Sequence, residues 1–251
     1  TYSVVVTDAN GCQKTIENIV LEQPEILEIS SETVTDITCN GSDDGSIDIA
    51  VSGGTGNYTY SWSNNATTQD LTDLSPGTYT VNITDQNGCL VSKEYTILEP
   101  DALSISADVS NFNGFEISCN GASDGAIDIT VSGGNVAGNA NYTYVWSTTD
   151  GSGLIQGEED QSGLGPGTYT VSVTDENNCT ATQSFTLTQA QPLNYVLDRK
   201  QDITCFGDDD GAIEISVTDG TGIYTYDWST TNGSGLVQGQ QDQSGLSPGD
   251  Y

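Results

Sequence analysis

Acidic side chains recur at fixed distances from the cysteines of this sequence. Acids lie three residues before, five residues after and nine residues after one set of cysteines, and four residues before a second set. Carboxylates and the carbonyls of Gly-rich turns are the hard oxygen ligands that Ca²⁺ uses. The candidate ligands for structural calcium are Asp36, Asp44, Asp48, Asp85, Glu116, Asp124, Asp128, Asp175, Asp202, Asp210 and Glu214. Because the spacing matches neither an EF-hand nor a nonapeptide calcium repeat, the alternative is that they form turns and solvated strand faces.

The six cysteines occupy two fixed places in the repeated pattern, and the chain has no His. An even number of cysteines without His predicts disulfides and an oxidising compartment. Two pairings are open, and free thiols are a third possibility. Pairing within repeats is favoured because it closes each module on itself: Cys39–Cys89 and Cys119–Cys179, with Cys12 and Cys205 paired outside the chain. Pairing between repeats would instead join Cys12–Cys39, Cys89–Cys119 and Cys179–Cys205.

The segment Thr148–Leu164 and its near copy Thr230–Leu246 are longer than their counterpart in the first repeat. Recognition residues concentrate on loops of a rigid scaffold, so these loops are candidate contact surfaces for polysaccharide or a protein partner. Their acids are Asp150, Glu158, Glu159, Asp160 and Asp242. The alternative is a plain solvated loop.

The charge balance argues against several kinds of partner. Against 36 Asp and Glu there are only 4 Lys and Arg, which gives a formal charge of −32. A surface this acidic repels nucleic-acid backbones and anionic membranes, and no stretch approaches the roughly 18 apolar residues of a membrane helix. The acids recur in every repeat and do not point to a single cleft, so we expect no enzyme activity.

Three sequence landmarks show that the chain repeats itself. Pro-Gly-Thr-Tyr-Thr-Val-x-x-Thr-Asp occurs at 76–85 and 166–175, and parts of it stand at both ends of the chain. The segment that begins at Ile37 returns at Ile117 and Ile203, and Tyr-Thr-Tyr-x-Trp-Ser stands at 58–63 and 142–147, with a close copy at 224–229. The chain therefore reads as part of a longer tandem array. It comprises the end of a repeat (1–27), two complete repeats (28–102 and 103–192) and the start of another (193–251).

Each repeat reads as short strands joined by turns. Apolar residues alternate with polar ones at 47–52, 58–63 and 79–84, which predicts antiparallel strands with one buried face. Gly-Gly, Pro-Gly and Asn-Gly pairs supply the turns. The predicted fold is all-β: tandem Ig-like β-sandwich repeats that form an elongated array. One strand between Trp62 and Pro76 would put Cys39 and Cys89 at the same end of the sandwich, whereas two strands would not.

Taken together, these motifs resemble the SprB-type repeat of very large surface adhesins of Bacteroidota. The residues that carry the resemblance are Cys39-Asn-Gly through Asp48, the Tyr-Thr-Tyr-x-Trp-Ser run, Leu-x-Pro-Gly-Thr-Tyr-Thr-Val and Thr-Asp-x-Asn-Gly-Cys89. Phe206 and Asn177-Asn178 depart from the pattern. The resemblance implies an extracellular chain at the cell surface, exported by type IX secretion, and a weaker link to gliding motility. It supplies no catalytic or ligand-binding residues.

The leading hypothesis is a structural and adhesive stalk or filament, and the second is a module whose variable loops bind polysaccharide or protein. Its partners would be neighbouring repeats of the same chain and other copies in a fibre. No nucleic acid and no inserted membrane are expected.

Overall fold

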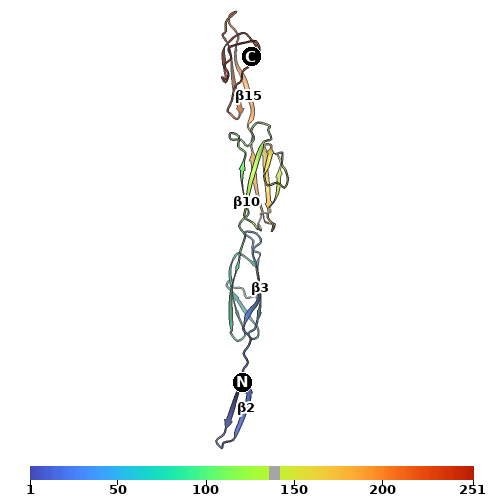
Figure 1. The fold of residues 1–251 in the computed structure, drawn as a ribbon, viewed down its shortest axis with the longest axis vertical. Helices are drawn as coiled ribbons and strands as arrows, with labels where there is room; N and C mark the ends of the chain where they lie inside the picture. Colours follow the sequence, from blue (N-terminus) through green and yellow to red (C-terminus); the bar gives the residue numbers. More distant parts are fainter. Residues whose placement is uncertain (136–141) are drawn as a thin grey trace. The chain divides into compact units, whose positions relative to one another are not determined.

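The computed structural model describes residues 1–135 and 142–251, and these residues form strands and turns with no helix (Figure 1). None of the described residues forms a helix that is long and apolar enough to cross a membrane. The sequence of the second repeat indicates an insertion at 135–140, before Tyr142, and except for Asn135 it lies outside the described residues. The chain divides into two compact units, Thr1–Ala102 and Leu103–Tyr251.

The first unit holds eight strands: β1 (Tyr2–Thr7), β2 (Gln13–Ile19), β3 (Glu28–Thr35), β4 (Gly45–Ser52), β5 (Thr59–Trp62), β6 (Leu71–Leu74), β7 (Gly77–Thr84) and β8 (Leu90–Ile97). The second unit holds β9 (Ser104–Val109), β10 (Gly125–Ser132), β11 (Thr143–Thr148), β12 (Gln161–Leu164), β13 (Gly167–Thr174), β14 (Thr180–Leu187), β15 (Gln191–Gln201), β16 (Gly211–Gly220) and β17 (Gln243–Leu246).

Strands β3 to β8 form one complete module, called module 1 (residues 28–102). Its two antiparallel sheets have the strand orders β3-β4-β6 and β5-β7-β8. The predicted alternation holds, because Ile47 and Ile49 from one sheet and Val81 and Ile83 from the other are all fully buried. They share one core with Trp62. The module is therefore an immunoglobulin-like β-sandwich, which confirms the predicted fold class.

Strands β5 and β6 follow one another in the same direction along module 1, but they belong to different sheets. Strand β5 is antiparallel to β7 with Thr59 opposite Thr84, and β6 is antiparallel to β4 with Leu74 opposite Gly45. After Trp62 the chain leaves the β5-β7-β8 sheet and continues in the same direction on the β3-β4-β6 sheet. Only one strand, β6, therefore lies between Trp62 and Pro76, yet it does not reverse the chain direction.

Strands β9 to β14 repeat this architecture as module 2 (residues 103–190), with the strand orders β12-β10-β9 and β11-β13-β14. Its core contains Ile127, Trp146 and Val171, which take the places of Ile47, Trp62 and Val81. The same sequence landmarks thus produce the same buried positions.

The remaining strands form incomplete versions of the module. Strands β1 and β2 pair as an isolated hairpin that corresponds to β7–β8. Strands β15, β16 and β17 form one three-stranded sheet that corresponds to β3-β4-β6, and we call residues 191–251 the C-terminal module. Among its described residues, the Tyr224–Trp228 run that matches β5 lies outside any strand.

Candidate functional site

The chain enters each complete module at one end and leaves it at the opposite end. In module 1, Gly54 donates a backbone hydrogen bond to Glu25 O (2.9 Å), just before β3 begins. At the other end Ile37 donates to Leu98 O (2.9 Å), just after β8 ends. Strands β3 and β8 therefore run in the same direction on different sheets, because Glu28 pairs with Ser52 and Gly77 pairs with Ile97 at opposite ends.

The exit of the chain is held by what we call the exit loop, residues 36–44 in module 1. Asp36 Oδ1 accepts a hydrogen bond from Leu98 N (2.8 Å), and Asn40 Nδ2 donates to Pro100 O (3.0 Å). Gly41 N donates to Glu99 Oε2 (3.1 Å). The loop is closed on itself by Asp44, which accepts from both the backbone N (3.0 Å) and the hydroxyl of Thr38.

Module 2 forms the same exit loop at residues 116–124. Glu116 Oε2 accepts from Thr188 N (2.8 Å) and Thr188 Oγ1 (2.6 Å), in place of the single bond from Asp36. Asn120 Nδ2 donates to Ala190 O (3.0 Å), and Asp124 accepts from Ser118 N (3.1 Å) and its hydroxyl. The C-terminal module keeps the closing pair, with Asp210 accepting from Thr204 N (3.0 Å) and its hydroxyl.

These hydrogen bonds stabilise the ionised carboxylates. The Thr38 hydroxyl, followed by the Thr38 backbone N–H, lowers the pKa of Asp44 from its ordinary value. Ser118 lowers the pKa of Asp124 in the same way. The hydroxyl of Thr188 lowers the pKa of Glu116. Donors directed at a carboxylate favour its charged form, so the exit loops are built for the ionised acid.

The other end of the module is held by the entrance turn, residues 85–89. Asp85 is 5% exposed and accepts from Thr55 N (2.8 Å), Asn87 N (2.9 Å) and Cys89 N (2.8 Å). Burial acts to raise the pKa of Asp85, but these backbone donors outweigh it and the pKa is lowered. A Cβ on Gly54 would lie 2.9 Å from Asp85 Oδ2, and Gly54 has φ +66°. The Gly-Gly pair is therefore required for the chain to approach this carboxylate.

The entrance turn recurs in the other repeats. Asp175 is also 5% exposed and accepts from Asn135 N (2.7 Å), Asn177 N (3.0 Å) and Cys179 N (2.8 Å). In the isolated hairpin Asp8 accepts from Asn10 N (2.9 Å) and Cys12 N (2.8 Å). Asn178 replaces the glycine of the pattern and still adopts the left-handed conformation with φ +67°.

The structure corrects the expected disulfide pairing. Cys12, Cys89, Cys119 and Cys205 are exposed free thiols, while Cys39 and Cys179 are each disulfide-bonded. Neither within-repeat bridge is formed, because the exit loop and the entrance turn lie at opposite ends of β8. Eight strand residues span about 26 Å, whereas a disulfide requires Cα atoms within about 7 Å. Every between-repeat pair considered above also includes at least one free thiol. That the chain forms a disulfide is confirmed.

The candidate calcium ligands do not converge. Over residues 1–135 and 142–251, no three His, Cys, Asp or Glu side chains group as a metal site would require. The acids nine residues after the first cysteine lie on β4, β10 and β16, where Asp48 and Asp128 are exposed and Glu214 is half-buried. There Asp48 is opposite Thr33, Asp128 is opposite Asp108, and Glu214 is opposite Arg199. Asp202 forms an ion pair with Lys200 (2.8 Å).

Two acids of the variable loop of module 2 bond the loop to the strands β13 and β10 beside it. Asp150 Oδ1 accepts from Thr168 N (2.8 Å), and Asp160 Oδ1 accepts from Ile129 N (2.9 Å). Glu158 contributes its carbonyl, which accepts from Trp146 Nε1 (3.0 Å). Burial, followed by the Glu159 carboxylate, raises the pKa of Tyr144 to about 12.

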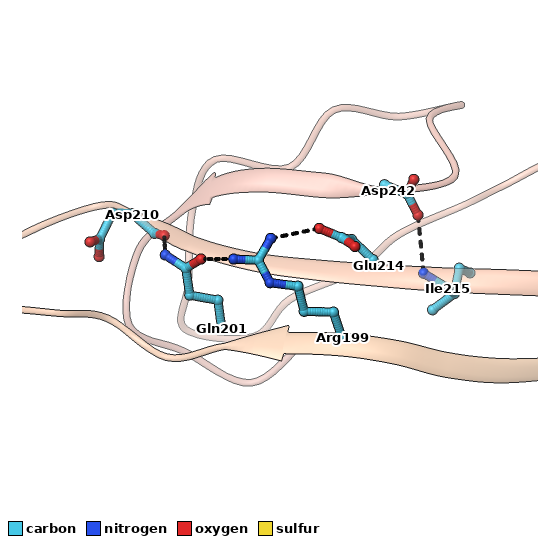
Figure 2. A network of polar contacts seen from close by, with 6 residues as sticks. All are labelled: Arg199, Gln201, Asp210, Glu214, Ile215 and Asp242. Carbon is cyan, nitrogen blue, oxygen red and sulfur yellow. Dashed lines mark hydrogen bonds and ion pairs between the residues drawn. The ribbon is translucent and has the colours of Figure 1, made fainter.

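Figure 2 shows the matching arrangement in the C-terminal module. Asp242 Oδ1 accepts from Ile215 N (3.0 Å), and Arg199 Nη1 contacts Glu214 Oε1 (2.8 Å). Arg199 also donates to Gln201, whose amide in turn donates to Asp210 O (3.0 Å). The ion pair thereby connects the strand pair β15–β16 with the end of the exit loop.

Two groups were not anticipated from the sequence. Glu32 on β3 forms an ion pair with Lys93 on β8 (2.5 Å) and accepts from the Tyr95 hydroxyl (2.9 Å), and these partners lower its pKa. This links the two sheets of module 1. Tyr169 is fully buried and bonds through its hydroxyl to Ser152 and Gly165. The repeated tyrosine of Pro-Gly-Thr-Tyr was the sequence signal that could have pointed to the Tyr169 contacts. The Glu32–Lys93 ion pair occurs in one module, so no repeated pattern pointed to it.

A family model described as "SprB repeat" matches the chain at residues 31–67, 116–151 and 198–233. The chain carries SprB repeats. Each match contains an exit loop and the strand that follows it. No curated protein sequence matches the chain.

Among solved structures, the chain is similar to a C-terminal 282-residue fragment of intimin, solved in complex with the intimin-binding domain of the translocated intimin receptor. That match has 18% identity and a TM-score of 0.30, and covers 65% of this chain and 66% of the other. A second match is murine CEACAM1b, with 14% identity and a TM-score of 0.24, covering 63% of this chain and 100% of the other.

Proposed function

We propose that the SprB repeats of this chain form a stalk that carries tension at the surface of a cell. The observation that carries the proposal is the path of the chain through each complete module. It enters beside Gly54 and Asp85 and leaves beside Asp36 and Asn40, at the opposite end. A module of this kind adds its whole length to an array.

The strand arrangement supports a mechanical role. A pull on the two ends of module 1 acts on β3 at one end and on β8 at the other. Each is an edge strand held by one long antiparallel pairing, β3 with β4 and β8 with β7. Because the force runs along these strands, the inter-strand hydrogen bonds are sheared together and do not open one at a time. The carboxylate bonds of the exit loop add resistance where the force leaves the module.

Location at the cell surface is supported by the kind of repeat and by the disulfide. SprB repeat proteins are cell-surface proteins, and disulfides persist in oxidising compartments. The charge of −32 favours solubility and repels neighbouring chains of the same kind. Adhesion, gliding motility and export by type IX secretion are the biological settings proposed for such a stalk.

Calcium is not needed for this role as we propose it. The exit and entrance acids already accept hydrogen bonds from the backbone, and hydroxyls and N–H groups take the place of a cation. Small-angle scattering of the chain with Ca²⁺ and with EDTA tests both points. We expect a thin particle of about 100 Å or more in both conditions, since each sandwich is roughly 30 Å long. A compact particle in both conditions would refute the stalk. An extended particle only with Ca²⁺ would make Asp44, Asp85 and their counterparts calcium ligands.

A binding role for the variable loops is the second candidate. It is supported by Ile155 and Val237, which occupy matching loop positions and are 56% and 55% exposed. Loops fixed by internal hydrogen bonds can present such side chains to polysaccharide or protein at low entropic cost. A glycan array separates the candidates: saturable binding by the chain that is lost in Ile155→Asp with Val237→Asp would establish a binding module, and an absence of binding favours the stalk alone.

A further inference from the structure

The connector between module 2 and the C-terminal module is very short. Strand β14 ends at Leu187 and β15 begins at Gln191, so only residues 188–190 join them. Each connector residue has two soft backbone dihedrals, which would by themselves let the two modules swing. All three connector residues are bonded to the exit loop of module 2, so these bonds decide how stiff the joint is.

The first two connector residues are held by an acid and a backbone amide of the exit loop. Thr188 donates to Glu116 Oε2 from its N–H (2.8 Å) and from its hydroxyl (2.6 Å). Gln189 accepts through Oε1 from Gly121 N (2.7 Å). These bonds fix the chain at the point where β14 ends.

The last connector residue is held by the side chain of Asn120. Its Nδ2 donates to Ala190 O (3.0 Å), and Ala190 is 1% exposed. Because a buried carbonyl without a donor is costly, this bond favours one orientation of the peptide unit that follows Ala190. Pro192 then fixes its own φ and restricts Gln191 before it to extended conformations. Each residue from Thr188 to Pro192 is therefore restrained.

Module 1 holds the chain that leaves it with the same set of contacts, which we call the exit clamp. The contacts are those of Asp36 with Leu98, Gly41 with Glu99 and Asn40 with Pro100. Because two modules form the clamp with different connector residues, it is a property of the repeat. The C-terminal module departs from it at one position, where Phe206 stands in place of the asparagine. Phenylalanine has no side-chain amide, so an exit loop with this residue cannot make the last bond.

We propose that the exit clamp locks the joint between successive modules and that the residue after the exit-loop cysteine sets its stiffness. With asparagine, as at Asn120, all three connector residues are held and the joint resists bending. With phenylalanine, as at Phe206, the last connector residue is released and the joint acts as a hinge. This inference rests on the proposed stalk, and it makes the stiffness of each joint a property that the sequence of the exit loop determines.

The test is the backbone dynamics of the intact chain, measured by NMR relaxation of its amides. We expect order parameters of about 0.85 at Ala190 and Gln191, the value of a rigid backbone. The variants Asn120→Asp and Asn120→Phe should lower them toward about 0.6, below which a backbone is flexible. Aspartate keeps the shape of asparagine and removes only the donor, whereas phenylalanine reproduces the residue of the C-terminal module.

The matched control is Asn40→Asp, which removes the same bond from module 1 and should leave Ala190 and Gln191 unchanged. Amides of Val171 and Val173 in the core of module 2 should keep their hydrogen-exchange rates in both Asn120 variants, which separates a released joint from an unfolding module.

Four results would overturn the proposal. They are order parameters at 190 and 191 that do not change in the Asn120 variants, that are already below about 0.6 in the unmodified chain, or that fall equally in Asn40→Asp, and a loss of protection in the core of module 2. The scattering experiment tests the stalk separately, because an extended chain with a flexible joint agrees with the stalk and contradicts only the clamp.

Discussion

Replacing Tyr169 with phenylalanine tests whether the Pro-Gly-Thr-Tyr tyrosine fixes the variable loop to module 2. The Tyr169 hydroxyl accepts from Ser152 N (2.9 Å) and lies 2.8 Å from both Ser152 O and Gly165 O. The ring is fully buried, and a Cβ on Gly151 would come within 2.4 Å of it. Tyr79 in module 1 is the natural control, because its hydroxyl bonds only to Ser75 O (2.9 Å).

The expected cost follows from the groups that lose their partner. Removing the hydroxyl leaves the Ser152 amide without this acceptor and the Gly165 carbonyl without this donor, whereas the Ser152 carbonyl still accepts from Gly165 N (3.3 Å). A buried polar group left unsatisfied costs about 1–3 kcal/mol. Because Ser152 is itself exposed, water replaces part of the loss, and we expect about 2 kcal/mol for Tyr169→Phe. Tyr79→Phe removes one half-exposed bond and should cost about 0.5 kcal/mol.

Native-state hydrogen exchange resolves the two modules within one chain. Amides of Val171 and Val173 should exchange about 30-fold faster in Tyr169→Phe, since each 1.4 kcal/mol is a factor of ten, while Val81 and Ile83 keep their rates. The thermal midpoint of module 2 should fall by about 8–16 °C. Equal effects of Tyr169→Phe and Tyr79→Phe, or no effect on Val171, would refute the reasoning.

Three further predictions concern packing, charge and pH. Gly45→Ala should destabilise module 1 by about 2 kcal/mol in urea unfolding, because its Cβ would lie 2.8 Å from Ile97 in a filled core; an unchanged urea midpoint would contradict this close packing. Asp108→Arg should stabilise module 2 by about 0.5 kcal/mol, because it turns the like-charged pair with Asp128 into the kind of pair that Arg199 and Glu214 form; the gain should disappear in 1 M salt, and an unchanged midpoint at low salt would refute it. Acid should unfold the exit loops, because Asp44, Asp124 and Glu116 have lowered pKa values in the folded state. Their contribution is present above the ordinary values of 3.8 and 4.5 and is lost as the pH falls through the folded pKa, so urea midpoints should drop below about pH 4.5; midpoints that rise steadily down to pH 2 would contradict it.

The sequence was sufficient to predict the sandwich and its core. Period-two alternation at Ile47, Ile49 and Val81 identifies the buried face because side chains of a strand point alternately to its two sides. The sequence shows acids at fixed distances from the cysteines. Asp44, Asp85 and Asp175 accept hydrogen bonds within turns, which agrees with the alternative that these acids form turns.

The cysteine pairing could not be predicted, because it depends on the direction of a short strand. The sequence predicts that the number of strands between Trp62 and Pro76 decides whether Cys39 and Cys89 share an end. Strands β5 and β6 are both four residues long and together make a single passage along the module, so the count misled. A change of sheet within one passage leaves no periodicity signal in the sequence. The Glu32–Lys93 ion pair was missed for a similar reason, since its partners are 61 residues apart and come from different sheets.

The most direct test of the account is single-molecule stretching of the chain from its two ends, in reductant so that the bonds of Cys39 and Cys179 do not limit extension. Each complete module contains about 75–90 residues, or roughly 250–300 Å of extended chain. Shear of the β3–β4 and β7–β8 pairings predicts two separate unfolding peaks, one for module 1 and one for module 2, with length gains slightly below that range. Smooth extension without discrete peaks would contradict the proposal that these SprB repeats carry tension.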